Sequence, residues 1–291
     1  TGASGISDVF ANRITFPIHD AAGNPIGFSA RTMDPDNPSK YVNTTDTPLF
    51  HKGEIVYNAH RARMSARREG KVYVCEGVTD VIAFARAGVQ NAVCTLGTSC
   101  TKQQIEILHH MAPRVIFCYD GDAAGQNATM KAGRLAREAG CEVAVVDNRT
   151  GLDPDELIRK EGADAFKAML GKELIWMEFV LQYLKNRTNF DNYQERKDFV
   201  TKAKAELDTL TDEVDRRYFT EEISRISGFH LDYTPKEAHT APSTYARTKL
   251  IGGLDQAEEI ILAMMLAHKE ASQHFSETLG FLQNKDRDSV A

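Results

Sequence analysis

The chain has 291 residues, of which 42% are hydrophobic and 26% are charged. This composition is typical of a folded protein with a substantial core, and the length corresponds to one large domain or two to three small ones. The formal net charge of −6 excludes a protein held on nucleic acid by overall charge, so a local basic patch or bound metal ions must provide any such contact.

The first 70 residues predict a β-hairpin, a loop and a helix. Residues 13–31 form two apolar runs around the turn-forming stretch 20–24, which is typical of a hairpin. Residues 32–53 are rich in Pro, Asp, Asn and Thr and predict an extended loop. Residues 54–69 predict a helix whose basic end carries Arg61, Arg63, Arg67 and Arg68.

Between residues 71 and 147, short apolar strands alternate with helices. The predicted strands cover residues 72–75, 92–96, 115–119 and 143–146, and the predicted helices cover residues 79–87, 101–111 and 123–139. This alternation indicates an α/β fold with a parallel sheet covered on both faces.

The remainder of the chain predicts helices. Residues 154–230 contain two apolar stripes at helical spacing, which are typical of the core of a small bundle. The stripes are Trp176, Phe179, Val180, Tyr183 and Leu184, and Phe199, Val200, Ala203 and Leu207. Residues 231–253 predict a linker, and a last amphipathic helix carries Ala257, Ile260, Ile261 and Met264.

No apolar run approaches the roughly 20 residues that span a bilayer, and no signal-peptide pattern opens the chain, so we expect no membrane contact and a cytoplasmic protein. The five cysteines form no C-x-x-C pair, and Cys75, Cys94 and Cys118 lie in strand-like runs. These features favour buried, reduced thiols over disulfides or a zinc site.

Acidic residues follow three of the four predicted strands. Glu76 and Asp80 follow the first, Asp120 and Asp122 the third, and Asp153 and Asp155 the fourth. The carboxyl ends of parallel strands share one edge of a sheet, and ligands bind at that edge, so we expect the three motifs to converge.

Clustered carboxylates repel one another, and a hard divalent cation with oxygen ligands would neutralise them. Helix capping is an alternative role for Asp80, and a serious one for Asp153 and Asp155, which flank a proline at the start of a helix. It explains Glu76, Asp120 and Asp122 poorly, because each stands just past an apolar strand.

With these motifs, the sequence resembles the TOPRIM module that DnaG-type primases share with topoisomerases, some nucleases and recombination-mediator proteins. Further segments are similar to the primase family in particular. They are residues 9–18, 27–31, 39–43 and 49–53 before the module, and residues 96–99, 118–125 and 152–156 within it. The resemblance runs from about residue 8 to 230. It implies a TOPRIM-type parallel sheet flanked by helices, with an N-terminal β-rich segment and a C-terminal helical bundle.

The resemblance also implies a site and its ligands. Glu76, Asp120 and Asp122 match the catalytic, metal-binding acids of the family, with Asp80, Asp153 and Asp155 as supporting metal-binding acids. Residues that match nucleotide- and DNA-binding positions are Arg31, Lys40, Asn43 and Lys52. The expected cofactor is Mg²⁺ or Mn²⁺, with two ions and no zinc. The expected reaction is synthesis of short RNA primers from ribonucleoside triphosphates on single-stranded DNA.

The same resemblance implies a domain plan. Residues 1–60 correspond to the last part of an N-terminal polymerase subdomain, 61–170 to the TOPRIM subdomain and 171–232 to a helical subdomain. A linker (233–253) and the start of a helicase-interacting domain (254–291) follow. We expect a fragment of a longer primase that contacts the replicative helicase through its C-terminal region.

Two other functions stay open at this stage. A TOPRIM nuclease would need the same acids, but it would leave the segment from Lys40 to Lys52 unexplained. A non-catalytic module that docks on helicase or single-stranded DNA would explain the C-terminal tail, but not the carboxylates.

Overall fold

The computed structural model describes residues 8–97, 100–148, 150–233, 253–267 and 274–275. The chain divides into a unit of residues 1–233 and a second unit of residues 234–291, which contains helix α10 (Gly253–Ala267). The predicted last helix is therefore confirmed, whereas nearly all of the predicted linker lies outside the described residues. No helix among the described residues is long and apolar enough to cross a membrane.

The N-terminal segment forms a three-stranded antiparallel sheet of β1 (Arg13–His19), β2 (Pro25–Thr32) and β3 (Tyr41–Asn43). Asp20 closes the predicted hairpin, because its Oδ1 accepts hydrogen bonds from the backbone N–H groups of Ala22 and Asn24. Strand β3 lies where the sequence predicted only a loop. It pairs with β2 through residues 29–31.

A 3-10 helix (Lys52–Glu54) and helix α1 (Ala59–Glu69) connect this sheet to the larger one. Helix α1 begins five residues later than the sequence predicted. Tyr57 forms an isolated antiparallel bridge with Cys94, and Asn58 has a left-handed φ of 67°, so the chain cannot be helical there.

The second sheet has the strand order β5-β4-β6-β7-β8. Strands β4 (Lys71–Cys75), β5 (Ala92–Cys94), β6 (Arg114–Cys118) and β7 (Glu142–Val146) are parallel, as predicted. The short edge strand β8 (Glu173–Ile175) runs antiparallel to β7 and was not predicted.

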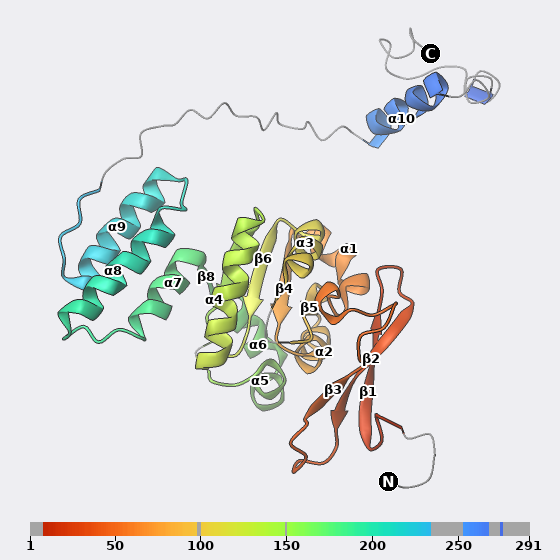
Figure 1. Cartoon of the computed structure of the whole chain (residues 1–291), viewed down its shortest axis with the longest axis horizontal. Helices are drawn as coiled ribbons and strands as arrows, with labels where there is room; N and C mark the ends of the chain where they lie inside the picture. The colour runs from red at the N-terminus through yellow and green to blue at the C-terminus, as the bar shows by residue number, and fades with distance from the viewer. Residues whose placement is uncertain (1–7, 98–99, 149, 234–252, 268–273, 276–291) are drawn as a thin grey trace. The chain divides into compact units, whose positions relative to one another are not determined.

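Helices cover both faces of this sheet (Figure 1). They are α2 (Val78–Arg86), α3 (Lys102–Met111), α4 (Ala123–Glu138), α5 (Pro154–Glu161) and α6 (Ala163–Leu170). Alternate strand residues divide between two cores. Val74 and Phe117 pack with α1, α3 and α4, whereas Cys75 and Ile116 pack with α2, α5 and α6.

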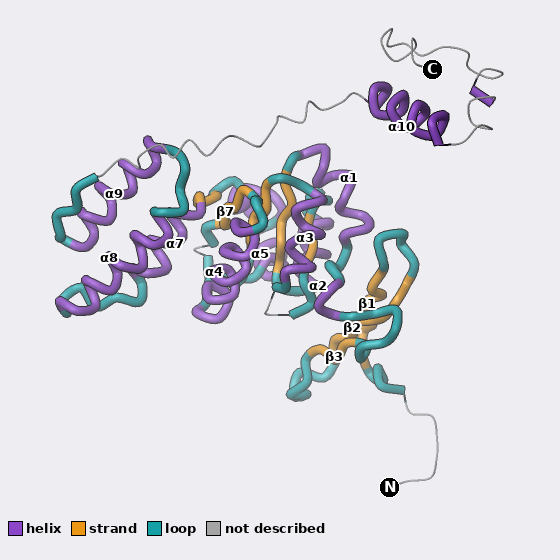
Figure 2. The backbone as a smooth tube through the Cα atoms, turned by 45° about the horizontal axis from the view of Figure 1, so that its top comes forward, coloured by secondary structure: helices purple, strands orange, loops and turns teal. Residues whose placement is uncertain are grey.

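Helices α7 (Trp176–Lys185), α8 (Tyr193–Leu207) and α9 (Glu213–Ser227) form a bundle that continues the core of α4. The three-stranded sheet and this bundle lie on opposite sides of the five-stranded sheet (Figures 1 and 2). At the bundle's contact with α4, buried Glu206 accepts hydrogen bonds from Arg134 Nε (2.5 Å) and Trp176 Nε1 (3.1 Å).

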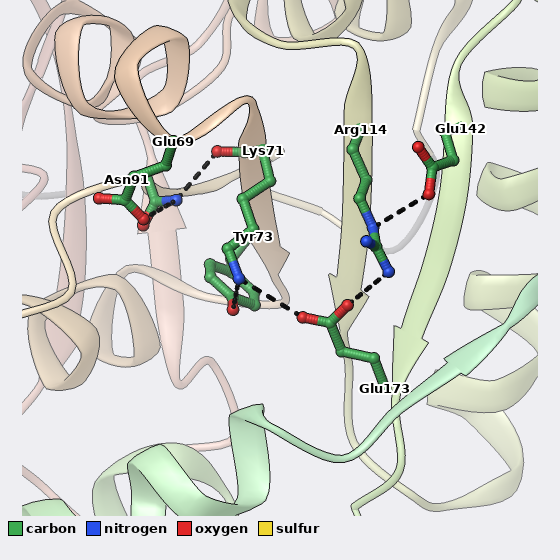
Figure 3. A network of polar contacts seen from close by, with 7 residues as sticks. All are labelled: Glu69, Lys71, Tyr73, Asn91, Arg114, Glu142 and Glu173. Carbon is green, nitrogen blue, oxygen red and sulfur yellow. Dashed lines mark hydrogen bonds and ion pairs between the residues drawn. The ribbon is translucent and has the colours of Figure 1, made fainter.

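Charged side chains from the first residues of β4, β6 and β7 form an ion-pair network with Glu173 of β8 (Figure 3). Glu173 of β8 pairs with Arg114 at 2.6 Å and with Lys71 at 3.6 Å, and Arg114 also pairs with Glu142 at 3.4 Å. These contacts attach β8 to β4 and β6, while the backbone of Glu173 pairs with Val146 at the carboxyl end of β7. All five cysteines are free thiols, and all except Cys100 are buried.

Candidate active site

Two of the acidic motifs meet where β4 and β6 end. These strands are neighbours in the sheet, with Cys75 opposite Cys118, so Glu76 and Asp120 leave the sheet side by side. Asp122 then caps helix α4, and Asp153 caps α5 beyond β7. The sheet therefore brings Glu76 and Asp120 together as the sequence predicted.

The contacts between these loops are close. Glu76 Oε1 accepts a hydrogen bond from the backbone N–H of Asp120 at 2.9 Å. A Cβ atom on Gly125 would lie 2.7 Å from the same oxygen and 2.2 Å from the carbonyl oxygen of Asp120, so only glycine fits at the start of α4. Asp122 Oδ1 accepts a hydrogen bond from Gly125 N at 2.7 Å.

Burial and mutual repulsion raise the pKa values of three of these carboxyl groups. Burial raises the pKa of Glu76, and the charges of Asp120 and Asp122 add to the effect. Burial also raises the pKa of Asp80 to about 7, with contributions from Asp120, Asp153 and Glu76. The pKa of Asp120 rises through burial and then through the charge of Asp153.

No cation in the described part of the chain offsets this charge, because Glu76, Asp80, Asp120 and Asp122 form no ion pair there. Nor do three acidic, histidine or cysteine side chains among the described residues gather closely enough to enclose an ion. The carboxylates therefore could supply only part of the coordination shell of a metal ion. This arrangement fits Mg²⁺, which typically takes one or two carboxylates and completes its shell with phosphate and water oxygens.

The third acidic motif, Asp153 and Asp155, caps a helix and forms ion pairs. Asp153 Oδ1 accepts a hydrogen bond from Glu156 N at 2.7 Å, which is the capping role considered from the sequence. Asp155 pairs with Arg86 at 3.1 Å and with Arg159 at 3.9 Å. The proposed metal role of Asp155 must therefore compete with two ion pairs, whereas Asp153 still acts electrostatically on Asp80 and Asp120.

Lys52 lies at the carboxyl end of β5. A Cβ atom on Gly97 would be 3.3 Å from Lys52 Nζ, so the ammonium group reaches the loop that follows this strand. Gln104, which the sequence analysis missed, holds the Lys52 segment in place. Its buried Nε2 donates to the carbonyl oxygens of Lys52 (3.1 Å) and Ile55 (2.8 Å). The Thr101-x-x-Gln104 capping box was the signal available in the sequence.

The three-stranded sheet presents one face to the acidic loops. Tyr41 Oη lies 3.3 Å from Thr79 Oγ1, within the first acidic motif. Because Arg31 is opposite Tyr41 and Asn43 follows two residues later on β3, these side chains share that face. Asn43 Oδ1 is buried and has no hydrogen-bond partner among the described residues. Lys40 is exposed just before β3.

Three family models match successive parts of the chain. Residues 1–63 match the N-terminal domain of the DNA primase catalytic core, residues 73–158 match a Toprim-like model, and residues 177–232 match the DnaB-helicase binding domain of primase. The last match covers α7–α9, whereas the sequence analysis assigned helicase contact to residues 254–291. That assignment stays a prediction.

Curated relatives agree with these models. The DNA primase of Halalkalibacterium halodurans is 33% identical over 96% of this chain and 50% of its own length. The DNA primase of Geobacillus stearothermophilus is 34% identical over 93% of this chain and 48% of its own length. The chain thus spans about half the length of the curated relatives it matches.

Solved structures of primase catalytic cores superpose on the chain. The E. coli primase catalytic core is 34% identical with a TM-score of 0.66, covering 81% of this chain and 76% of that one. A DnaG primase catalytic domain bound to single-stranded DNA is 34% identical with a TM-score of 0.65, covering 76% and 70% of the two chains. The chain therefore belongs to the DnaG primase family and carries the family's Toprim-type catalytic fold.

Proposed function

We propose that this chain carries the catalytic site of a primase that joins ribonucleotides into short primers on single-stranded DNA. The observation that supports this most is the unpaired carboxylate group at the sheet edge, with Glu76 bonded to the backbone of Asp120 and Asp122 beside them. The single-stranded DNA bound to one structural relative supports the choice of template.

In this proposal, Glu76, Asp120 and Asp122 hold divalent metal, Mg²⁺ or Mn²⁺, with Asp80 and Asp153 as supporting acids. Bound ions would lower the pKa of the primer 3′-hydroxyl and neutralise charge on the incoming triphosphate. Asp122 is exposed and keeps one carboxylate oxygen without a hydrogen bond to the described residues, so it can bind metal while it caps α4.

Lys52, Arg31, Asn43 and Lys40 form the nucleotide and template side of the proposed site. A triphosphate brings several negative charges next to carboxylates, so fixed cations are needed in addition to the metal. The position of Lys52 beside Gly97 supports this role. The shared face of Arg31 and Asn43, which Tyr41 joins to Thr79, supports a role for that face in binding template or nucleotide.

The helical bundle suggests a partner. Because residues 177–232 match a helicase-binding model, we propose that α7–α9 contact the replicative helicase. The predicted contact through residues 254–291 stays a second candidate surface. Pull-down of helicase by chains truncated after residue 233 distinguishes the two.

Replacing Asp120 with Asn tests the catalytic proposal. The change preserves size and removes the charge that metal requires, so we expect ribonucleotide incorporation to fall by at least about 100-fold, as for loss of one group that stabilises transition-state charge. The circular-dichroism spectrum and melting temperature should stay close to those of the unmodified chain, because Asp120 contributes to the site and not to the core. Incorporation within a few fold of the unmodified chain would contradict the assignment.

Replacing Lys52 with Ala separates a polymerase from a nuclease. If the site binds a triphosphate, Lys52 neutralises part of its charge, so we expect ribonucleotide binding, measured by calorimetry, to weaken much more than Mn²⁺ binding. A hydrolytic nuclease binds a single phosphodiester and has less need of this cation. Lys40→Ala should change nucleotide binding in the same direction. Unchanged nucleotide affinity in both variants, with metal binding intact, would favour the nuclease.

A further inference from the structure

A side-chain amide from α4 contacts the loop that carries the proposed metal ligands Asp120 and Asp122. Gln126 Nε2 donates a hydrogen bond to the carbonyl oxygen of Gly121 at 3.0 Å. That carbonyl belongs to the peptide unit that continues into the backbone nitrogen of Asp122. Since a peptide unit is planar, holding its oxygen restrains the positions of the Asp122 nitrogen and Cα, from which the carboxylate extends.

The opposite end of the same amide is held by the helical bundle. Gln126 Oε1 accepts a hydrogen bond from Arg187 Nη1 at 2.8 Å. An arginine has donors only, so it must face the amide oxygen, and the amide nitrogen is then directed at Gly121. Arg187 therefore sets the orientation of the Gln126 amide.

Arg187 is itself fixed at the end of α7. Its guanidinium lies 3.9 Å from the ring centre of Tyr183, and Nη1 also donates to the Tyr183 carbonyl oxygen at 3.2 Å. Tyr183 Oη in turn donates to Asn127 Oδ1 at 2.7 Å, so Tyr183 of α7 and Arg187 just past its end contact two adjacent residues near the start of α4. Neighbouring backbone confines the loop from another direction, since a Cβ on Gly121 would lie 3.0 Å from the Asn148 carbonyl oxygen.

We propose that Gln126 and Arg187 are positioning residues: Arg187 orients the Gln126 amide, and Gln126 holds the Gly121–Asp122 peptide so that the Asp122 carboxylate points at metal. This inference rests on the proposed metal role of Asp122. It also makes the end of α7 part of the support of the active site, so the bundle and the acidic loop are mechanically coupled. In this proposal, neither residue binds metal or substrate directly.

The test is Mn²⁺ binding to the whole chain, followed by electron paramagnetic resonance of the free ion, together with melting temperatures. Gln126→Met preserves side-chain length and removes both hydrogen bonds of the amide. Arg187→Met keeps an unbranched apolar side chain and removes the guanidinium group. We expect each to weaken Mn²⁺ binding about tenfold, as is typical when groups that orient metal ligands are lost. Melting temperatures should not change, because Gln126 is partly exposed and Arg187 exposed. Arg187→Lys keeps a donor and should restore most of the affinity.

A matched control tests whether the substitution itself affects Mn²⁺ binding, and a double variant tests whether the two residues act together. Gln103→Met makes the same change on the exposed surface of α3 and should bind Mn²⁺ like the unmodified chain. The double variant Gln126→Met/Arg187→Met should bind no more weakly than Gln126→Met alone, because both changes break one chain of contacts. Additive losses would overturn the coupling.

Asp122→Asn separates this inference from the function on which it depends. If Asp122→Asn loses Mn²⁺ binding while Gln126→Met binds normally, the positioning role is overturned and the proposed function stands. If Asp122→Asn itself binds Mn²⁺ like the unmodified chain, the metal role of Asp122 fails, and the inference fails with it.

Discussion

Two glycines on α4 stand where the backbone approaches another group too closely for a side chain. A Cβ on Gly125 would collide with the Asp120 carbonyl and Glu76 Oε1, and a Cβ on Gly133 would lie 2.1 Å from Cζ3 of Trp176. We expect Gly125→Ala to weaken Mn²⁺ binding at least about tenfold, because the change displaces two proposed metal ligands. Gly133→Ala should destabilise the fold by about 1–3 kcal/mol through overpacking, yet leave Mn²⁺ affinity unchanged. Equal effects of both changes on affinity would contradict the assignment.

At the same scale, the sequence predicted the acids better than the amides. Glu76, Asp120 and Asp122 were recognisable because a carboxylate just past an apolar strand has no role in the core. Gln126 carries no such signal, and the capping box marks Gln104 only as a helix start. Both amides gain their roles at the site through contacts 5 to 61 residues away along the chain. The capping role of Asp153 followed from local pattern alone, because a cap depends on residues within one helical turn.

At the scale of elements, the four parallel strands and the helices between them followed from apolar periodicity. The short strands β3 and β8 did not. Each has three residues and lies at a sheet edge, so pairing with a distant strand defines it more than its own residues do. Glu173, the first residue of β8, is held by Arg114 and Lys71 from other strands, which no local pattern reveals.

One buried carboxylate strengthens the contact between α4 and the bundle. Glu206 is 7% exposed and accepts hydrogen bonds from both Arg134 and Trp176. Glu206→Gln supplies only one accepting atom and no charge, so we expect it to lower the free energy of unfolding by about 2–3 kcal/mol. Glu222→Gln is the matched control, because Arg225 of its ion pair is 71% exposed and the loss should be below about 1 kcal/mol. Urea denaturation measures the free energy of unfolding of both variants. Similar losses would show that buried Glu206 stabilises the fold no more than an exposed ion pair does.

At the scale of the whole molecule, the sequence predicted that strand ends share an edge, but not which strands are neighbours. The order β5-β4-β6-β7 places Glu76 beside Asp120 and sets Asp153 one strand further away. The chain also brings β1–β3 to the side of β5 and the bundle to the side of β8 (Figure 1). The acidic edge is thus contacted from two sides, by Tyr41 at Thr79 and by Arg187 through Gln126.

This arrangement predicts that metal stabilises the whole fold. Without metal, repulsion and burial raise the pKa values of Glu76, Asp80 and Asp120, which means that their ionised forms destabilise the folded state. An ion that binds only the folded chain adds about 2.7 kcal/mol at 100 times its dissociation constant. For a unit of this size that corresponds to roughly 5–10 °C in melting temperature.

Scanning calorimetry with Mn²⁺ or Mg²⁺, and again after excess chelator, measures this shift in melting temperature. In Asp120→Asn the metal-free protein should melt no lower than the unmodified chain, because one repelling charge is gone, and added Mn²⁺ should raise its melting temperature little. An equal rise in both proteins would place the stabilising ion away from Asp120 and contradict the site.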